Sequence, residues 1–209
     1  SLLKTLPPID VAIVGEPTLM QLAVAEKGLV VFDAVITGTA SHAAHPNADN
    51  PIMKLPEVLR WFNNFTFEKE SEVLGPVKMT VTQVSAGKQH NVVPADVHLV
   101  VDVRVNDCYS NQEIVDLLQQ DAPCTLTPRS TNLNSSSIPL THELVQAGIG
   151  LGREPYGSPT LSDQAKLSCP SLKLGPGDST RSHTANEFIH VSEIEEGISI
   201  YINLLNEIL

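Results

Sequence analysis

The feature that most constrains the fold is an alternating pattern in the middle of the chain. In residues 77–82 and again in residues 97–105, hydrophobic and polar side chains alternate, and Gly87 lies between the two segments. Successive side chains of a β-strand point to opposite faces of a sheet, so this period of two predicts two strands joined through a turn. We therefore expect a sheet that buries one face.

Capping signals predict a helix on each side of these two strands. Asn50 followed by Pro51 is typical of an N-cap and a first helical position, and this helix should run to about Asn64. Ser110 and Glu113 have the spacing of a capping box, which opens a second helix.

Two further segments complete this unit. Residues 29–37 are apolar and β-branched, and residues 124–131 alternate again, so both should be strands. The resulting order β-α-β-β-α-β across residues 28–133 is that of a ferredoxin-like sandwich.

The residues on either side of this unit have the pattern of an α/β domain. The apolar run at 10–14 and a short segment at 171–174 should be buried strands. We therefore expect an α/β fold in which a ferredoxin-like domain, residues 28–133, is inserted into an α/β domain formed by residues 1–27 and 134–209.

The C-terminal segment carries strong helical signals. Ser192 and Glu195 have the spacing of a capping box, and Thr141 is placed to cap an earlier helix. The apolar residues that should line one face of the last helix are Ile194, Ile198, Tyr201, Leu205 and Ile208.

Charge and composition disfavour several classes of partner. The chain has 13 Lys and Arg against 24 Asp and Glu, a formal net charge of −11, whereas nucleic acids and anionic membranes are bound through clustered cations. Every apolar stretch is interrupted before the roughly 18 to 20 residues that a bilayer requires. The three cysteines form no CxxC pair and no leader is visible, so we expect a cytoplasmic protein with no nucleic-acid or membrane partner.

Single residues give only weak signals of chemistry. Glu16 follows the strand expected at 10–14, and in open α/β sheets ligands bind beyond the carboxyl ends of the strands. Three of the seven histidines, His42, His90 and His183, lie in polar segments unlike a core. The sequence has no HExxH, CxxC, GxGxxG, P-loop or GxSxG motif, so spacing alone assigns no metal site, nucleotide site or serine nucleophile.

Taken together, seven short motifs are far more specific than any one of them. In chain order they are Val14–Thr18, Ala25–Gly28, Gly38–Pro46, His90–Pro94, Val101–Arg104, Thr160–Asp163 and Gly175–Phe188. In this order they resemble the M20 family of dinuclear metallohydrolases, and among its branches the chain looks most like the acetylornithine deacetylases. The resemblance runs from about residue 8 to the end.

The resemblance implies a metal site and a homodimer. Residues 1–27 and 134–209 would be parts of the catalytic domain, and the ferredoxin-like insertion would be its lid and dimerisation domain. Two divalent metal ions are expected, zinc first and cobalt as the alternative, with Glu16 a ligand of one ion and His183 a ligand of the other. His42 would reach the partner subunit's active site and donate a hydrogen bond to the developing oxyanion, with His45 as the competing candidate.

The resemblance also implies a substrate, a small-molecule N-acyl amino acid. Asn91, Arg104, Thr160 and Ser162 match residues that bind substrate, and an Arg suits a carboxylate through a bidentate pair. The expected activity is removal of an N-acyl group, as from N-acetylornithine or N-acetylcitrulline in arginine biosynthesis, by a water that the two ions activate.

Two rival interpretations remain at this point. One is a dipeptidase or aminopeptidase of the same family, and the other is a non-catalytic dimerisation module. The family's His-x-Asp pair, bridging Asp and Glu-Glu pair have no counterpart in the sequence. This polypeptide by itself is therefore expected to be inactive.

Overall fold

A computed structural model describes residues 5–208, and the chain separates into two compact units. The first unit contains the chain up to Lys27, the short segment Glu72–Leu74 and the chain from Ser135 onward. The second unit, called the lid below, contains Gly28–Ser71 and Gly75–Asn134.

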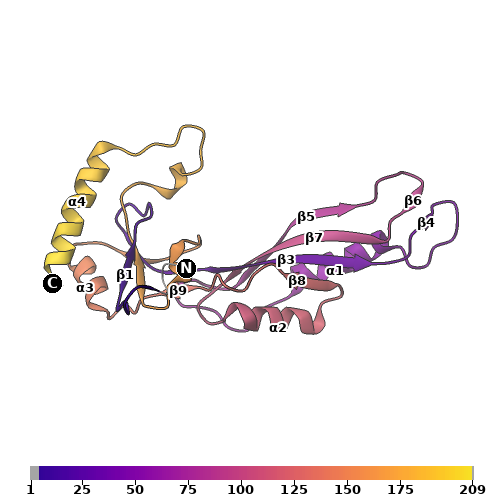
Figure 1. The fold of residues 1–209 in the computed structure, drawn as a ribbon, viewed down its shortest axis with the longest axis horizontal. Helices are drawn as coiled ribbons and strands as arrows, with labels where there is room; N and C mark the ends of the chain where they lie inside the picture. The colour runs from indigo at the N-terminus through magenta and orange to yellow at the C-terminus, as the bar shows by residue number, and fades with distance from the viewer. Residues whose placement is uncertain (1–4, 209) are drawn as a thin grey trace. The chain divides into compact units, whose positions relative to one another are not determined.

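The lid is a four-stranded antiparallel sheet with two helices, and its strands lie side by side in Figure 1. In chain order its elements are β3 (Gly28–Thr37), α1 (Pro51–Asn64), β5 (Lys78–Ala86), β7 (Asp96–Val105), α2 (Asn111–Asp121) and β8 (Thr125–Pro128). The strand order across the sheet is β5-β7-β3-β8. This is the βαββαβ sandwich that the sequence predicts, so the expected fold class is confirmed.

The centre of the lid is the pairing of β3 with β7. Ten residue pairs run without interruption from Gly28–Val105 at one end to Thr37–Asp96 at the other. Alternate side chains of both strands are buried, as the period of two predicts. The core on that face includes Phe32, Leu99, Val101, Ile114 and Leu118.

The predicted helix starts of the lid are confirmed by their hydrogen bonds. The Asn50 carboxamide oxygen accepts from the amide of Ile52 at 3.0 Å. The Ser110 hydroxyl accepts from the Glu113 amide at 3.2 Å, and the Glu113 carboxylate accepts from the Ser110 amide at 2.7 Å. Both helices therefore begin where side-chain oxygens satisfy free backbone amides.

A small two-stranded ribbon that the sequence analysis does not predict extends the lid. Its strands, β4 (Ser41–His42) and β6 (Val92–Val93), are separated in the chain by α1 and β5, pair with each other and lie beyond one end of the four-stranded sheet (Figure 1). The amide of Gly38 donates to the carbonyl oxygen of Ala95 at 2.8 Å, which ties this β4–β6 ribbon to the Thr37–Asp96 end of the strand pair.

The first unit is a mixed sheet with two helices. Its strands are β1 (Ala12–Val14), β2 (Leu22–Glu26), β9 (Ser136–Ser137), β10 (Pro155–Ser158) and β11 (Ser171–Lys173), in the order β1-β11-β2-β10 with β9 beside β2. The helices are α3 (Glu143–Gly150) and α4 (Val191–Asn206), with short 3₁₀ turns η2 (Asp163–Lys166) and η3 (Ser179–Arg181). Strand β1 is parallel to β11, and its side chains are half-buried because it pairs on one side only in the described residues.

The expected caps of α3 and α4 are wrong by one and two residues. The N-cap of α3 is His142 rather than Thr141, and its Nδ1 accepts from the amide of Leu144 at 3.2 Å. Helix α4 starts directly after His190, whose backbone amide donates to the Glu193 carboxylate at 2.9 Å. A histidine at the N-cap is not a preferred residue, so the sequence signal pointed to nearby hydroxyls instead.

The buried face of α4 matches the expected one only in part. Gly197, Ile200 and Leu204 are buried, and the expected Tyr201 and Ile208 are partly buried against the same core. The other expected residues, Ile194, Ile198 and Leu205, are 40%, 55% and 37% exposed. The helix carries apolar residues around much of its circumference, so periodicity alone does not select the face. Among residues 5–208, no helix is long and apolar enough to cross a membrane.

Adjacent leucines of α2 test the assigned core of the lid. Leu118 is fully buried, so Leu118→Ala should lower the free energy of unfolding by about 2–5 kcal/mol. Leu117, 39% exposed, is the control, and Leu117→Ala should cost less than about 1 kcal/mol. The single tryptophan, Trp61, lies in α1, so its fluorescence during urea unfolding reports on the lid. Equal losses for the two variants would contradict the assigned packing.

Candidate active site

Glu16 lies at one edge of the first unit's sheet, where two loops meet. Strands β1 and β11 are parallel neighbours, so their carboxyl ends share this edge. The Gly175 carbonyl oxygen accepts from the amides of Thr18 at 3.1 Å and Met20 at 3.0 Å. A Cβ atom on Gly175 would lie 2.6 Å from the Glu16 carbonyl oxygen, so this contact requires glycine. The loop that follows β11 is thus held against the Glu16 turn.

His183 lies in that same loop, which is tied to α4. The backbone of His183 is left-handed, with φ of 60°, and its amide donates to the Glu187 carboxylate at 3.1 Å. Two residues earlier, Arg181 donates from Nη1 to the Glu193 carboxylate at 3.0 Å. This guanidinium holds the pKa of Glu193 below its usual range. Both contacts fix the path of the loop around His183.

Glu16 and His183 are residue types that commonly bind zinc, but two side chains are too few to form a zinc site. A carboxylate and an imidazole are ordinary zinc ligands, and the Glu16 carboxylate has no hydrogen bond or ion pair to any of residues 5–208. The described part of the chain contains no group of three or more His, Cys, Asp or Glu side chains placed to hold one ion. These residues alone do not complete a zinc site.

His42 lies in the β4–β6 ribbon of the lid, and Asn91 directly precedes β6. The amide of Ala43 donates to the Asn91 carbonyl oxygen at 2.9 Å, beside the pairing of His42 with Val92. The amide of Ala44 donates to His42 Nδ1 at 3.1 Å, so the proton of a neutral His42 ring lies on Nε2. His42 is exposed and offers this Nε2–H as a donor. The His45 ring is also exposed, 5.7 Å from His42 between centroids, and remains the alternative.

Arg104 lies near the opposite end of the lid sheet. It is eight residues along β7 from Asp96, which corresponds to roughly 26 Å of strand. Its Nε and Nη2 atoms donate to Asp102 at 2.8 and 3.0 Å, and Nη1 remains for another acceptor. One lid therefore does not bring Arg104 together with His42 and Asn91.

Thr160 and Ser162 are brought together by a buried ion pair. Lys173 Nζ lies 3.1 Å from Glu26 Oε2, and these side chains are 4% and 0% exposed. The Ser162 amide and hydroxyl donate to the two Glu26 oxygens at 3.1 and 2.8 Å. Lys173 Nζ donates to the carbonyl and hydroxyl oxygens of Thr160 at 3.0 and 3.2 Å.

The sequence analysis missed Glu26 and Lys173 as site residues. Each is the last residue of an otherwise uncharged buried strand, β2 for Glu26 and β11 for Lys173. A charge is costly to bury unless it is paired, so a charged residue ending such a strand indicates a buried partner. That signal was present in the sequence, although it does not identify the partner.

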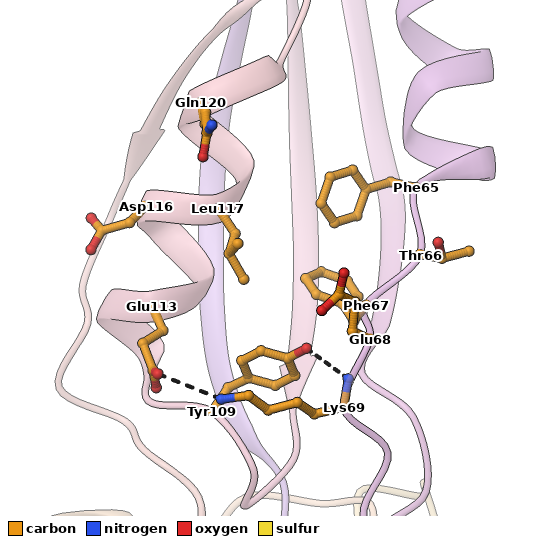
Figure 2. Close-up of a pocket in the computed structure, with 10 residues that line it drawn as sticks. All are labelled: Phe65, Thr66, Phe67, Glu68, Lys69, Tyr109, Glu113, Asp116, Leu117 and Gln120. Atoms are coloured by element: carbon orange, nitrogen blue, oxygen red, sulfur yellow. Dashed lines mark hydrogen bonds and ion pairs between the residues drawn. The ribbon is translucent and has the colours of Figure 1, made fainter.

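A separate cavity in the lid contains none of the predicted site residues. It has a volume of about 490 Å³ and lies between the 65–69 segment, Tyr109 and α2 (Figure 2). The Tyr109 hydroxyl accepts from the Lys69 amide at 2.8 Å, and the Lys69 ammonium lies 4.7 Å from the ring centroid and 3.7 Å from Glu113. These internal contacts account for the polar groups at its base, so we assign the cavity no part in the site.

Comparison with known proteins identifies relatives of the lid and of the whole chain. Residues 24–123 match the family model M20_dimer, described as a peptidase dimerisation domain. A succinyl-diaminopimelate desuccinylase from Rickettsia felis is 26% identical, over 96% of this chain and 58% of that protein. The desuccinylase from Erythrobacter litoralis is 24% identical, over 92% and 55%. The chain thus spans little more than half the length of these relatives.

Solved structures share the fold. A tripeptidase from Staphylococcus aureus aligns with a TM-score of 0.71 at 16% identity, covering 95% of this chain and 57% of that one. A dinuclear metal-binding peptidase of the M20 family from Bacillus subtilis aligns with a TM-score of 0.63 at 15% identity, covering 93% and 55%. The relatives reported above are desuccinylases, so the specific likeness to acetylornithine deacetylases and the place in arginine biosynthesis find no support in them.

Substitution of two lysines, one in the buried ion pair and one in an exposed pair, tests whether the Lys173–Glu26 pair is buried. Lys173→Met leaves the Glu26 carboxylate buried without its cation and should lower the free energy of unfolding by about 3–5 kcal/mol. Lys166→Met is the control, because the Lys166–Asp163 pair is exposed and worth at most about 1 kcal/mol. Calorimetry combined with hydrogen exchange of β2 and β11 measures both. Similar, small losses for the two variants would show that the pair is not buried.

Proposed function

We propose that this chain is part of a metal-dependent amide hydrolase of the M20 type, which removes an N-acyl group from an amino acid. The observation that carries the proposal is the contact between the Glu16 turn and the loop of His183 at one sheet edge. Each residue would supply one ligand to a different ion, as the motif resemblance implies. When bound, the ions would polarise the amide carbonyl and lower the pKa of water.

The chain's own residues would bind and orient the substrate. The Nε2–H of His42 would donate to the acyl oxygen as negative charge develops on it, which stabilises that charge. Arg104 would use its remaining Nη1 donors for a substrate carboxylate. Asn91 and Thr160 would provide further polar contacts. The amide and hydroxyl of Ser162 already donate to Glu26, so Ser162 would act through the position of its loop.

We infer that His42 acts on the partner subunit's site. His42 and Asn91 lie at the end of the lid sheet remote from Gly28, where the chain enters the lid. The dimerisation-domain match supports a homodimer, and β5 is an edge strand whose outer side is unpaired within residues 5–208. A second copy with two-fold symmetry would present its β4–β6 ribbon to the first copy.

The candidate substrates differ in the acyl group that the enzyme would remove. The desuccinylase relatives favour an N-succinyl amino acid, whereas the motifs resemble those of enzymes that act on N-acetylornithine or N-acetylcitrulline. Release of free amine from N-succinyl-diaminopimelate, N-acetylornithine and a dipeptide, assayed with the complete enzyme, tests the proposal. Turnover of an N-acyl amino acid supports it, and cleavage of the dipeptide alone would assign the protein to the peptidases.

A non-catalytic dimerisation module is the second candidate. It is favoured by the lack, in residues 5–208, of any group of three metal-ligating side chains. A complete protein that binds no metal and hydrolyses none of the three substrates would support it over the hydrolase.

The chain of 209 residues, tested alone, should neither hold a metal pair nor hydrolyse substrate. Glu16 and His183 would belong to different ions, and a single protein ligand does not retain zinc against dilution. Metal analysis after gel filtration should give well under one zinc per chain, and the N-acyl substrates should remain intact. Two zinc ions per chain with turnover would contradict this assignment of ligands.

Mixed dimers test whether His42 acts in trans. In the complete enzyme, His42→Ala and His183→Ala homodimers should each be nearly inactive, and co-folding them should restore about a quarter of wild-type activity. Random pairing makes about half of the dimers mixed, and each mixed dimer has one intact site of two. If mixed dimers, confirmed by differential tags, are as inactive as the parents, His42 acts within its own subunit.

A further inference from the structure

The polar contacts of the Lys173 ammonium group lie inside the first unit. It forms an ion pair with Glu26, with 3.1 Å between Nζ and Oε2. Its two hydrogen bonds go to the Thr160 carbonyl oxygen at 3.0 Å and the Thr160 hydroxyl oxygen at 3.2 Å, so these three contacts hold the cation. Two of the three contacts go to one residue, Thr160, so this buried cation fixes both the backbone and the side chain there.

The hydroxyl of Ser162 is committed to the interior. It donates to Glu26 at 2.8 Å and accepts from the amide of Gln164 at 3.2 Å, which starts the η2 turn. The other Glu26 oxygen accepts from the Ser162 amide at 3.1 Å. Glu26 therefore fixes the inner side of the same loop that Lys173 holds at Thr160.

Thr160 differs from Ser162 because its side chain is exposed to solvent while its hydroxyl oxygen is hydrogen-bonded by buried groups. Its hydroxyl oxygen accepts from Lys173 and lies 3.0 Å from the Ser158 hydroxyl, which is itself buried. The Ser158 hydroxyl can donate either in that contact or to the Thr160 carbonyl oxygen at 3.5 Å, and when it donates to the hydroxyl oxygen, both lone pairs of that oxygen are occupied. The Thr160 hydroxyl proton then has no acceptor in the interior and is available to a group outside.

We propose that the buried Lys173–Glu26 pair is a positioning element that presents Thr160 as a hydrogen-bond donor to an acceptor oxygen of the substrate. The acceptor class is a carboxylate or an amide carbonyl, because both groups accept and neither donates through oxygen. Lys173 and Glu26 touch no substrate themselves and act through Thr160. The identification of the acceptor as part of a substrate rests on the proposed function.

The first test needs no enzymatic activity and uses the 209-residue chain. Three-bond couplings to the Thr160 methyl group, measured by NMR, should report one fixed rotamer in the parent protein. The double variant Glu26→Gln/Lys173→Met keeps a neutral partner for Ser162 but removes the ammonium, so the couplings should average. Lys166→Met, which removes the exposed pair with Asp163, should leave them unchanged. A fixed rotamer in the folded double variant would overturn the positioning role.

The second test is a double-mutant cycle in the complete enzyme. Thr160→Val and Glu26→Gln/Lys173→Met should each raise KM for the N-acyl substrate by about ten- to a hundredfold, the range for a lost hydrogen bond to a charged or polarised acceptor. Combining them should raise KM no further, because the pair acts through the hydroxyl that Thr160→Val removes. Thr160→Ser should keep most of the affinity.

The two tests separate the positioning role from the proposed function. One contrary result is that the increases in KM caused by Thr160→Val and by Glu26→Gln/Lys173→Met multiply when the changes are combined, and another is that KM does not change in Thr160→Val. Either result would mean that the ion pair has only a structural role. A parent enzyme that hydrolyses no N-acyl amino acid would refute the proposed function, while the rotamer measurement would still decide whether Lys173 positions Thr160.

Discussion

The structure of the lid depends on the uninterrupted pairing of β3 with β7. Ten consecutive residues of each strand are in register, and their alternate side chains form the apolar face that packs against α1 and α2. A slip of one residue would turn every buried side chain of a strand toward the open face, so burial of Phe32 and Leu99 fixes the register. The register then fixes which polar residues stand at each end of the sheet.

That constraint divides the predicted site residues into separate groups. His42 in the β4–β6 ribbon and Asn91 beside it lie at one end of the strand pair, and Arg104 lies near the other end. The first unit contributes the sheet-edge loops of Glu16 and His183 and the segment at Thr160 and Ser162. The two ends of the lid sheet are too far apart for both to contact one small substrate. For that reason we propose that the β4–β6 ribbon acts at the site of a second copy.

Local signals in the sequence predicted local structure well. The Ser110–Glu113 box and the Asn50 cap depend on residues a few positions apart, and the alternation in β7 reflects burial of one sheet face. The start of α4 was misplaced because a histidine occupies the N-cap, and its buried face depends on which neighbours pack against it. Glu26 and Lys173 lie far apart in the chain, so only the pairing of β2 with β11 reveals that their charges meet. Glu16 was expected from its place after a buried strand and His183 from its polar segment, and their roles as metal ligands, implied by the motif resemblance, remain predictions.

The central proposal is that one active site is formed by residues of two subunits, with the metal ligands Glu16 and His183 from one subunit and His42 from the other. Anomalous scattering at the absorption edge of the bound metal, from crystals of the complete dimer, tests it most directly. The account predicts two metal peaks per subunit, one at the Glu16 carboxylate and one at the His183 imidazole, with the nearest His42 belonging to the partner. Peaks remote from Glu16 and His183, or a nearest His42 from the same subunit, would contradict it.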